Sequence, residues 1–300
     1  MTAEPFNRVA IIGVGLIGGS FALALKRAGL AGRVIGVGRG RANLERALEL
    51  GMIDEIADAR SACTQADLVF LATPVGQMAA VMAAIAPVLA QSVIITDGGS
   101  TKQDVVALAR RHLGAHLARF VPAHPIAGGE KTGAEAAHAD LFDARKVIVT
   151  PLAETAPDAR AAVAAAWRAC GAQVFELSPE LHDRIYAAVS HLPHLLAFAL
   201  IDGFAAKPYA DVLFEYAGRG LADTLRLAGG SAEMWRDIVL ANRDALLAEL
   251  DDHVARLAGA RAMLAANDGA ALEAMFANAR QTSSLRRGPG SSALAQTSPD

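Results

Sequence analysis

The chain has 300 residues, of which 53% are apolar and only 5% aromatic, and its formal net charge is −3. This length allows two domains with hydrophobic cores, and the alanine-rich, aromatic-poor composition favours a helix-rich α/β protein over a β-sandwich. The small charge and the lack of a large basic run argue against nucleic acid as a partner.

Cys63 and Cys170 are isolated and lack CxxC spacing, which favours a reduced compartment. The N-terminus lacks the basic and apolar regions of a signal peptide. Arg, Asp or Gly interrupts each apolar run before it reaches the ~20 residues of a membrane span. We therefore expect a cytoplasmic protein that is not inserted in a membrane.

Apolar strand segments alternate with helical segments over the first 180 residues. We expect strands at 9–14, 33–37, 67–72 and 92–96, and helices at 20–28, 43–50, 78–89 and 104–113. Strands at 146–150 and 173–177, with a helix at 159–169, are expected to extend the same sheet. This alternation predicts an α/β fold with a Rossmann-type, doubly wound parallel sheet.

The strand signals stop after Pro179, and one helix follows another, for example at 187–204 and 232–257. We predict a dinucleotide-binding domain at 1–180, an all-α substrate and dimerisation domain at 181–281, and a disordered tail at 282–300. By analogy, a helical domain after a Rossmann domain often builds a dimer, so we expect a homodimer.

A GxGxxG motif at 13–18 follows the first strand and opens the first helix. Its first glycine permits a tight turn, its second lets the backbone approach a pyrophosphate, and its third permits close helix–strand packing. The motif predicts a dinucleotide site with the cofactor-binding residues Gly13, Gly15, Leu16, Ile17 and Gly18.

The end of the second strand lacks the Asp or Glu that usually binds the ribose 2′-hydroxyl of NAD. It carries Arg39 and Arg41 instead, and a guanidinium suits a 2′-phosphate. NADP is therefore favoured over NAD, although both arginines could simply belong to a solvated loop.

Two further strand ends point to the carboxyl edge of the sheet, where open α/β sheets bind ligands. Thr73 and Pro74 end one strand and are expected to contact the cofactor. Ser100 follows another strand, and it is expected to bond a ligand, to cap the next helix, or to do both.

The segment HPIAGGEKTG at 124–133 places a histidine, a glutamate and a lysine among small residues and three glycines. Such a loop lets the backbone and an imidazole come close to a small ligand. Neutral imidazole accepts a proton readily near pH 7, so His124 is a candidate base. The alternative is a histidine that merely caps a proline turn.

Together with this segment, the motifs GxGLIGGS, LATPV, DGGSTK, SHLPH and MWRDI resemble the prephenate and arogenate dehydrogenases of tyrosine biosynthesis, over about residues 9–250. The resemblance implies an oxidative decarboxylation that yields 4-hydroxyphenylpyruvate from prephenate or tyrosine from arogenate. Hydride leaves ring C4 for the nicotinamide, the C4 hydroxyl loses its proton, and carbon dioxide departs as the ring becomes aromatic.

The resemblance also implies residue roles. His124 would be the base with Ser100 at the same site, and Arg226 would hold the ring carboxylate, with Arg219 as a weaker alternative. The other residues expected to bind substrate or line its pocket are Asp183, His191, His194, Trp235 and Glu130.

Two features of the helical half limit these expectations. His191 and His194 share a helix face, but a metal site needs a third ligand that is not evident, so no metal is expected. Family members often carry a basic residue where this chain has Ala222, so the choice between prephenate and arogenate stays open.

Two alternatives remain at this point. A β-hydroxyacid dehydrogenase of the 6-phosphogluconate type would use a catalytic lysine in its helical domain, where this chain has only Lys207. A non-catalytic NADP-binding protein would keep the fold without turnover, and the joint presence of His124, Ser100 and Arg226 argues against it.

Overall fold

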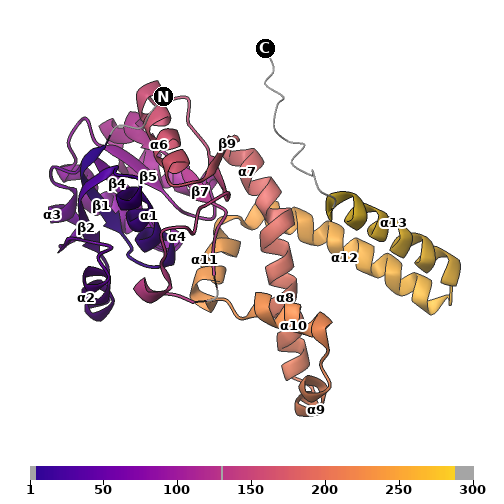
Figure 1. The fold of residues 1–300 in the computed structure, drawn as a ribbon. Helices are drawn as coiled ribbons and strands as arrows, with labels where there is room; N and C mark the ends of the chain where they lie inside the picture. Colours follow the sequence, from indigo (N-terminus) through magenta and orange to yellow (C-terminus); the bar gives the residue numbers. More distant parts are fainter. Residues whose placement is uncertain (1–4, 130, 288–300) are drawn as a thin grey trace. The chain divides into compact units, whose positions relative to one another are not determined.

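The computed structural model describes residues 5–129 and 131–287, and its ribbon is drawn in Figure 1. By its internal contacts the chain divides into two compact units, Met1–Leu246 and Leu247–Asp300. All the helices and strands that carry the candidate site belong to the first unit.

A six-stranded parallel sheet with the order β3-β2-β1-β4-β5-β6 forms the centre of the first unit. Its strands are β1 (Phe6–Ile12), β2 (Ala31–Val37), β3 (Glu55–Ile56), β4 (Leu68–Leu71), β5 (Ile94–Asp97) and β6 (Phe120–Val121). The middle strands are rich in apolar residues because helices cover both of their faces. The predicted sheet is confirmed, and the short β3 is an addition to it.

Helices cover the two faces of this sheet. The buried cluster on one face includes α1 (Leu16–Arg27), α2 (Arg41–Glu49) and α6 (Pro157–Ala169), where Phe21, Phe70 and Trp167 pack against one another. The cluster on the other face includes α3 (Ala59–Cys63), α4 (Val75–Ile85) and α5 (Gln103–His112). The sheet is therefore doubly wound, as predicted.

Strands at 146–150 and 173–177 do not extend this sheet, and that expectation is wrong. They form a second sheet of β7 (Ala123–Pro125), β8 (Lys146–Val149) and β9 (Gln173–Glu176), in which β7 and β8 are antiparallel. Pro122 separates β6 from β7 because it has no N–H for a strand ladder. Its carbonyl instead accepts the N–H of Thr150 at 2.9 Å, and the chain passes from one sheet to the other.

The helical part begins with one continuous helix made of α7 (Pro179–Tyr186), a π-helical turn (Ala187–His191) and α8 (Leu192–Ala205). The Ser178 side chain caps its start, and Pro179 occupies the first turn. Three helices follow in the first unit: α9 (Ala210–Glu215), α10 (Arg219–Ala228) and α11 (Ala232–Ala241).

The prediction of a single helix at 232–257 is also wrong, because the helix is interrupted at Asn242. Asn242 has φ −106° and ψ 31°, and α12 (Arg243–Ala265) begins after it. The Asn242 side chain is buried and forms hydrogen bonds with groups of α7 and of the π-helical turn. These contacts offset the cost of interrupting the helix.

The stretch Pro179–Ala205 is long and apolar enough to cross a membrane by length and composition, with a mean hydropathy of 1.4 over an 18-residue window. This differs from the expectation that every apolar run is too short. Core helices of proteins outside membranes meet the same criteria, and His182, Asp183 and His191 on this helix are buried against protein groups. The helix therefore packs against the protein at these three residues, while only 22% of its apolar window is buried.

The second unit contains the rest of α12 and α13 (Gly269–Arg287). The predicted tail from residue 282 therefore begins too early, because 282–287 are helical. The hydroxyls of Thr282 and Ser284 donate to carbonyls of the preceding turn, at 3.0 and 2.8 Å, and so fit within a helix. The rest of the predicted tail, 288–300, lies outside the described residues.

Candidate active site

The glycine motif forms a tight turn between β1 and α1 at the carboxyl edge of the large sheet. Gly13 has φ +103°, and a Cβ there would lie 2.5 Å from the carbonyl oxygen of Ala72. A Cβ at Gly18 would lie 2.0 Å from the carbonyl oxygen of Gly13. Both positions require glycine, since a side chain would push the turn away from the sheet.

The space over this turn fits a dinucleotide pyrophosphate. A Cβ at Gly15 would meet nothing within 4 Å, and Gly15 caps α1 without a side-chain bond. The first N–H groups of α1 therefore remain available to an anion. The hydroxyl of Thr73 at the end of β4 is buried without a hydrogen-bond partner among the described residues, and Pro74 is the N-cap residue of α4.

The motif also contacts the two loops that carry the other candidate residues. Leu16 lies 3.4 Å from a Cβ built at Gly129, and Ile17 lies 3.3 Å from one built at Gly98. The Asn43 side chain donates to the Val14 carbonyl at 2.6 Å and accepts the Ala134 N–H at 2.8 Å. The nucleotide turn is thus held against the segment after His124.

Arg39 lies at the end of β2 and is exposed, as its predicted role requires. When the Gln77 amide is oriented with its oxygen toward Arg39, that oxygen lies 3.2 and 3.1 Å from the two terminal guanidinium nitrogens. Gln77 belongs to the first turn of α4, so Arg39 is held beside the helix that begins at Pro74.

A buried ion pair fixes the backbone immediately before His124. The Asp97 and Lys102 side chains are completely buried and bonded to each other. Lys102 Nζ donates to the Ala123 carbonyl at 2.7 Å, and Asp97 Oδ1 accepts the Ala123 N–H at 3.0 Å. Both polar groups of the Ala123 peptide are therefore satisfied by one ion pair.

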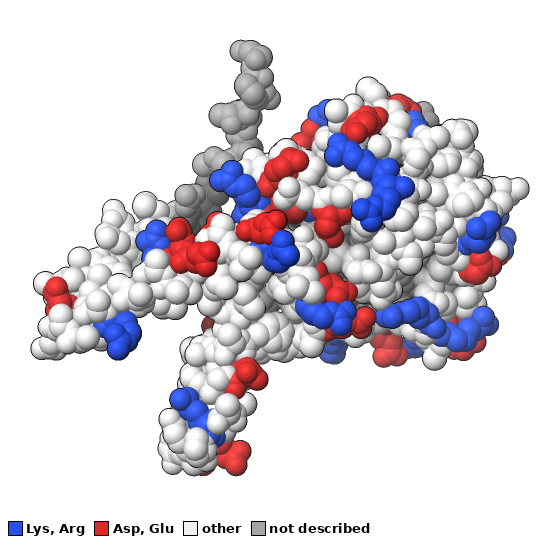
Figure 2. Space-filling model, turned by 180° about the vertical axis from the view of Figure 1, so that it is seen from behind, with Lys and Arg blue, Asp and Glu red and all other residues white. Residues whose placement is uncertain are grey.

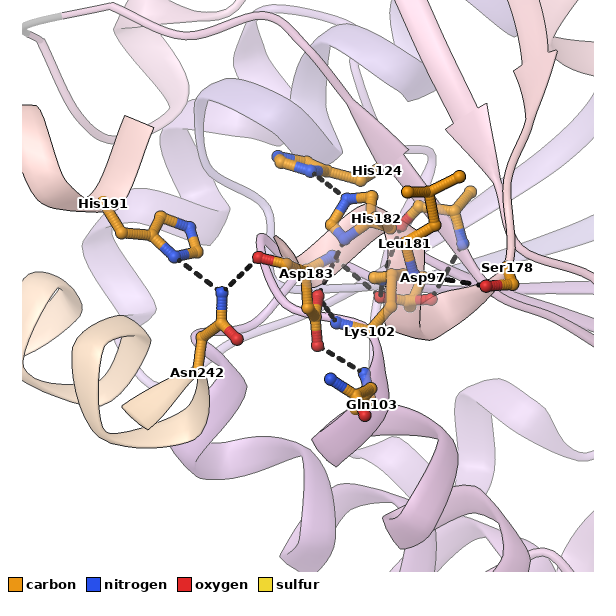
Figure 3. Close-up of polar contacts among 12 residues, drawn as sticks. Asp97, Lys102, Gln103, His124, Ser178, Leu181, His182, Asp183, His191 and Asn242 are labelled. Atoms are coloured by element: carbon orange, nitrogen blue, oxygen red, sulfur yellow. Dashed lines mark hydrogen bonds and ion pairs between the residues drawn. The ribbon is translucent and has the colours of Figure 1, made fainter. Parts of the chain in front are cut away.

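The His124 imidazole belongs to a chain of three polar side chains, drawn in Figure 3. Its Nδ1 lies 2.9 Å from His182 Nε2, and His182 Nδ1 lies 2.8 Å from Asp183 Oδ1. His182 and Asp183 are completely buried on α7. Burial is the largest cause that lowers the pKa of His124 well below 6.5, followed by the charges of His182 and Lys102.

The structure corrects the expected role of Asp183 in substrate binding. Asp183 Oδ1 accepts the Lys102 N–H and Oδ2 accepts the Gln103 N–H, both at 2.8 Å. These bonds cap the start of α5, and Oδ1 also holds His182. Burial with every carboxylate oxygen bonded to protein places Asp183 behind the site, so it is not free to contact a substrate.

Asn242 connects His191 to Asp183, and so to the contacts of His124 and His182. Its Nδ2 donates to the Asp183 carbonyl at 2.8 Å and faces His191 Nδ1 at 3.1 Å. Burial lowers the pKa of His191 to about 4. His191 is only 1% exposed, so the position lies at the inner wall of the candidate site.

The His194 ring stacks on Trp235, with centroids 3.8 Å apart and planes inclined by 23°. His194 Nδ1 lies 2.8 Å from the Ser190 carbonyl. Burial lowers the pKa of His194, and the positive charge of Arg226 lowers it further. His194 and Trp235, both predicted to bind substrate, are thus in direct contact, and Arg226 is exposed on α10, the helix that packs against α8.

The outcome differs for two other predicted site residues, Ser100 and Glu130. Ser100 is partly exposed, and the start of α5 is capped by Asp183, so the structure does not support the capping role for Ser100. Glu130 lies outside the described residues. Within the described part of the chain, no group of three or more His, Cys, Asp or Glu side chains is placed to hold a metal ion.

Sequence reasoning missed several residues that build the site. Asp97 and Lys102 stand in the quoted DGGSTK motif, and His182 precedes Asp183, but none of the three was assigned a role. The signal for Asn242 was a residue of low helix propensity inside a long predicted helix. Several of their partners lie 21 to 81 positions away in the sequence.

Basic and acidic side chains are mixed on the face that Figure 2 shows, where blue groups lie beside red ones. Several of the surface charges form ion pairs, such as Lys26–Asp54 at 2.7 Å and Arg27–Asp143 at 2.6 Å. The charges on the surface therefore partly neutralise one another.

A glycine turn for a pyrophosphate, and a half-buried imidazole on the strand that follows the large sheet, define a Rossmann-type, NAD(P)-dependent oxidoreductase. Residues 21–176 match the family model of the prephenate dehydrogenase nucleotide-binding domain, and residues 178–278 match the model of its dimerization domain. The chain belongs to the prephenate dehydrogenase family.

Relatives with solved structures or curated descriptions agree with this assignment. A cyclohexadienyl dehydrogenase of Zymomonas mobilis is 38% identical over 88% of this chain and 90% of its own length. A prephenate dehydrogenase of Bacillus subtilis is 34% identical over 91% of this chain and 74% of its own length. Prephenate dehydrogenase from Aquifex aeolicus, solved with hydroxyphenyl propionate and NAD+, is 32% identical, with a TM-score of 0.86 over 95% of this chain and 99% of that one. Family membership decides against the β-hydroxyacid dehydrogenase alternative.

Proposed function

We propose that this chain catalyses the NAD(P)-dependent oxidative decarboxylation of prephenate to 4-hydroxyphenylpyruvate, of arogenate to tyrosine, or of both. The observation that carries the proposal is the position of His124. Its backbone is fixed by a buried ion pair, and its Nδ1 is bonded to His182, so Nε2 is left for a ligand. The hydroxyphenyl propionate bound by the Aquifex aeolicus relative resembles the aromatic product of such a reaction.

The bound dinucleotide supplies the acceptor for the hydride that leaves ring C4. His124 accepts the proton of the C4 hydroxyl at Nε2, and the C4 oxygen becomes a carbonyl. The bond between C1 and the ring carboxylate then breaks, carbon dioxide leaves, and its bonding electrons make the ring aromatic. His124 returns the proton to the phenolate oxygen, so the base is regenerated.

The group of Arg226, His194 and Trp235 is proposed to hold the substrate. Arg226 binds the ring carboxylate, because a guanidinium pairs with a carboxylate in a planar, two-bond geometry. Trp235 supplies an apolar wall that is fixed by its stack on His194. His191 shapes the inner end of the pocket, and Ser100 contributes a hydroxyl near the cofactor.

NADP is the proposed cofactor, with NAD as the alternative. Gly13, Gly15, Leu16, Ile17 and Gly18 form the pyrophosphate turn, and Thr73 and Pro74 border it at the end of β4. Arg39, held by Gln77, suits the 2′-phosphate of NADP because no acidic residue ends β2. The Aquifex aeolicus relative was solved with NAD+, which is why NAD is kept as the alternative.

We also propose a cytoplasmic homodimer whose dinucleotide-binding domain and helical domain meet near residue 180. The match of 178–278 to a dimerization domain supports this assembly. Large apolar side chains are exposed on the helical part, including Val189, Val212, Tyr216, Leu257 and Phe276. A second copy of the chain would remove such groups from water.

The test is a four-way assay in which prephenate and arogenate are each combined with NAD and NADP, following formation of the reduced nicotinamide. His124→Asn should lower kcat by ~10²–10⁴-fold while dinucleotide binding is kept. His138→Asn is the matched control, because the exposed His138 side chain pairs only with Asp140 among the described residues and takes no part in the His124 contacts.

Turnover of at least one cyclohexadiene by the wild-type chain supports the proposal. Cofactor binding without turnover of either substrate would instead support the non-catalytic, NADP-binding alternative. Near-full activity of His124→Asn would remove His124 from the role of base.

A further inference from the structure

The chain of contacts from His124 to His182 to Asp183 determines where the protons of both imidazoles lie. An ionised carboxylate only accepts hydrogen bonds, so His182 must carry its proton on Nδ1, which faces Asp183 Oδ1 at 2.8 Å. His182 Nε2 is then an acceptor. It lies 2.9 Å from His124 Nδ1, which must therefore be the donor.

The ionisation states support this order. Burial alone would raise the pKa of Asp183, but the bonds from His182, Gln103 and Lys102 lower it overall. The backbone N–H groups of Lys102 and Gln103 belong to the start of α5, where the helix dipole favours a negative charge. Burial is the largest cause that lowers the pKa of His182, as it is for His124, so both imidazoles are neutral near pH 7.

We propose that His182 and Asp183 are positioning residues that hold His124 in the tautomer with a bare Nε2. This inference rests on the proposed function, in which His124 is the base. An isolated imidazole places its proton on either nitrogen, and only one of the two forms has its lone pair on Nε2. The contact chain selects that form before the substrate binds.

The same chain also has a role after proton transfer. The proton of the substrate hydroxyl moves to His124 Nε2, and His124 becomes an imidazolium that still donates through Nδ1 to His182 Nε2. His182 in turn donates through Nδ1 to the Asp183 carboxylate. No electrons are exchanged along the chain, and the proton returns from Nε2 to the product oxygen.

Other ionisable groups facing the two imidazoles come from several elements. Tyr186 of α7 packs against both rings, with centroids 4.9 Å from His124 and 4.5 Å from His182, and burial raises its pKa to about 12. Lys102 at the start of α5 acts on both histidines and is paired with Asp97 of β5. His191 of the π-helical turn completes the set. The charges of Asp183 and Asp97 favour an imidazolium at His182, and Asp183 is the one bonded to its ring.

Asp183→Asn is the sharpest variant, because the amide can reverse the whole chain. With its NH2 in the place of Oδ1, the new amide would lose the bond from the Lys102 N–H and donate to His182 Nδ1. His182 would then carry its proton on Nε2, and His124 would accept at Nδ1 and be protonated at Nε2. The base would then lack its lone pair on the substrate side. The same replacement in the serine-protease triad lowers kcat by about 10⁴ through the wrong tautomer.

We expect Asp183→Asn to lower kcat by ~10²–10⁴-fold, with the KM for the cyclohexadiene and the Kd for the dinucleotide changed less than about threefold. A purely structural role would change both binding constants instead, whereas the lost cap bond of α5 lowers the melting temperature in either case. The acid limb of kcat against pH should also shift to lower pH, because the carboxylate that stabilises the imidazolium is removed.

The second test compares the variants His182→Gln and His182→Phe. A glutamine oxygen can still accept the Nδ1–H of His124, whereas phenylalanine offers no acceptor. We expect kcat to decrease in the order wild type, His182→Gln, His182→Phe. Equal kcat in the two variants would contradict the tautomer role, and so would a kcat of His182→Phe within about threefold of wild type.

The wild-type chain allows a direct measurement that needs no variant. Long-range ¹H–¹⁵N correlation spectra of histidine-labelled protein distinguish protonated from unprotonated ring nitrogens, and His124→Asn assigns the signals. We expect a protonated Nδ1 and an unprotonated Nε2 for His124. A protonated Nε2 in the ligand-free protein would overturn the inference.

The outcomes separate this inference from the proposed function. If His124→Asn keeps its turnover, the proposed base is wrong. If His124→Asn is inactive while Asp183→Asn keeps kcat within about threefold of wild type, the base stands and the positioning role is wrong. If Asp183→Asn does not fold, the spectrum and the His182 pair still decide.

Discussion

His194 and Trp235 form a parallel stack, with ring centroids 3.8 Å apart, between α8 and α11. The positive charge of Arg226 lowers the pKa of His194, the histidine in this stack. Gly230 lies against the other end of the indole, where a Cβ would be 2.5 Å from Trp235 Nε1. The position of the Trp235 indole, the proposed wall of the substrate pocket, therefore depends on Gly230.

Gly230→Ala should move the indole and weaken substrate binding without unfolding the protein. We expect kcat/KM for the cyclohexadiene to fall by about tenfold, similar to the loss of one well-placed contact. Gly229→Ala is the matched control, because its Cβ would find no atom closer than 3.5 Å. Equal kcat/KM in the two variants would contradict the proposed wall.

Arg226→Ala should raise the KM for the cyclohexadiene far more than it lowers kcat. Loss of a charge-assisted pair with the ring carboxylate corresponds to about tenfold to a hundredfold in affinity. Steady-state kinetics at saturating dinucleotide measure both constants. A larger effect in Arg219→Ala than in Arg226→Ala would transfer the role to Arg219.

Arg39→Ala should raise the KM for NADP by about tenfold or more and leave the KM for NAD within about twofold, because only NADP carries the 2′-phosphate. Gln77→Ala should show the same pattern with a smaller change, since it removes only the partner that holds Arg39. An unchanged KM for NADP in Arg39→Ala would contradict the proposal that Arg39 binds the 2′-phosphate of NADP.

Lys102→Met should destabilise the protein by about 3–5 kcal/mol, because it leaves the Asp97 carboxylate buried and unpaired. Urea denaturation measures the free energy of unfolding. Lys26→Met breaks the partly exposed pair with Asp54 and should cost only about 0–1 kcal/mol. Similar costs for the two variants would show that burial of the Asp97–Lys102 pair is not decisive.

The free energy of unfolding should fall as the pH decreases from about 6.5 to 5. Folding lowers the pKa of His124, His182 and His191, so the unfolded chain binds protons in this range that the folded chain does not. Each group then contributes a loss of up to about 1.4 kcal/mol per pH unit. Denaturation at several pH values measures this slope, which His182→Gln should reduce. A stability independent of pH over this range would argue against neutral buried imidazoles.

Much of the fold was predictable because it follows from local pattern. The strands of the large sheet read as apolar runs, and the glycine spacing at 13–18 requires a turn that only glycine can form. The errors occurred where a distant partner overrides the pattern. Pro122 sends β7 into a second sheet, and Asn242 interrupts a helix because its side chain is bonded to α7 and the π-helical turn.

The candidate site was predictable in its residue types and less so in its connections. His124 stands in a motif that the sequence presents directly, whereas the role of Arg226 was implied by the family resemblance alone. Asp183 was expected at the substrate, and the structure places it behind His182, where it also caps α5. Nothing in the spacing of these residues encodes that cap, since Lys102 and Asp183 are 81 positions apart.

By itself, the sequence determined the alternation of strands and helices, the glycine turn and the presence of a histidine in a close-approach loop, since these depend on neighbouring residues. Only the tertiary structure decided that Asp97 and Lys102 fix the His124 backbone and that Asp183 holds His182. The physical reason is burial: in the low-dielectric interior each polar group must find a partner, and packing decides which distant residue provides it.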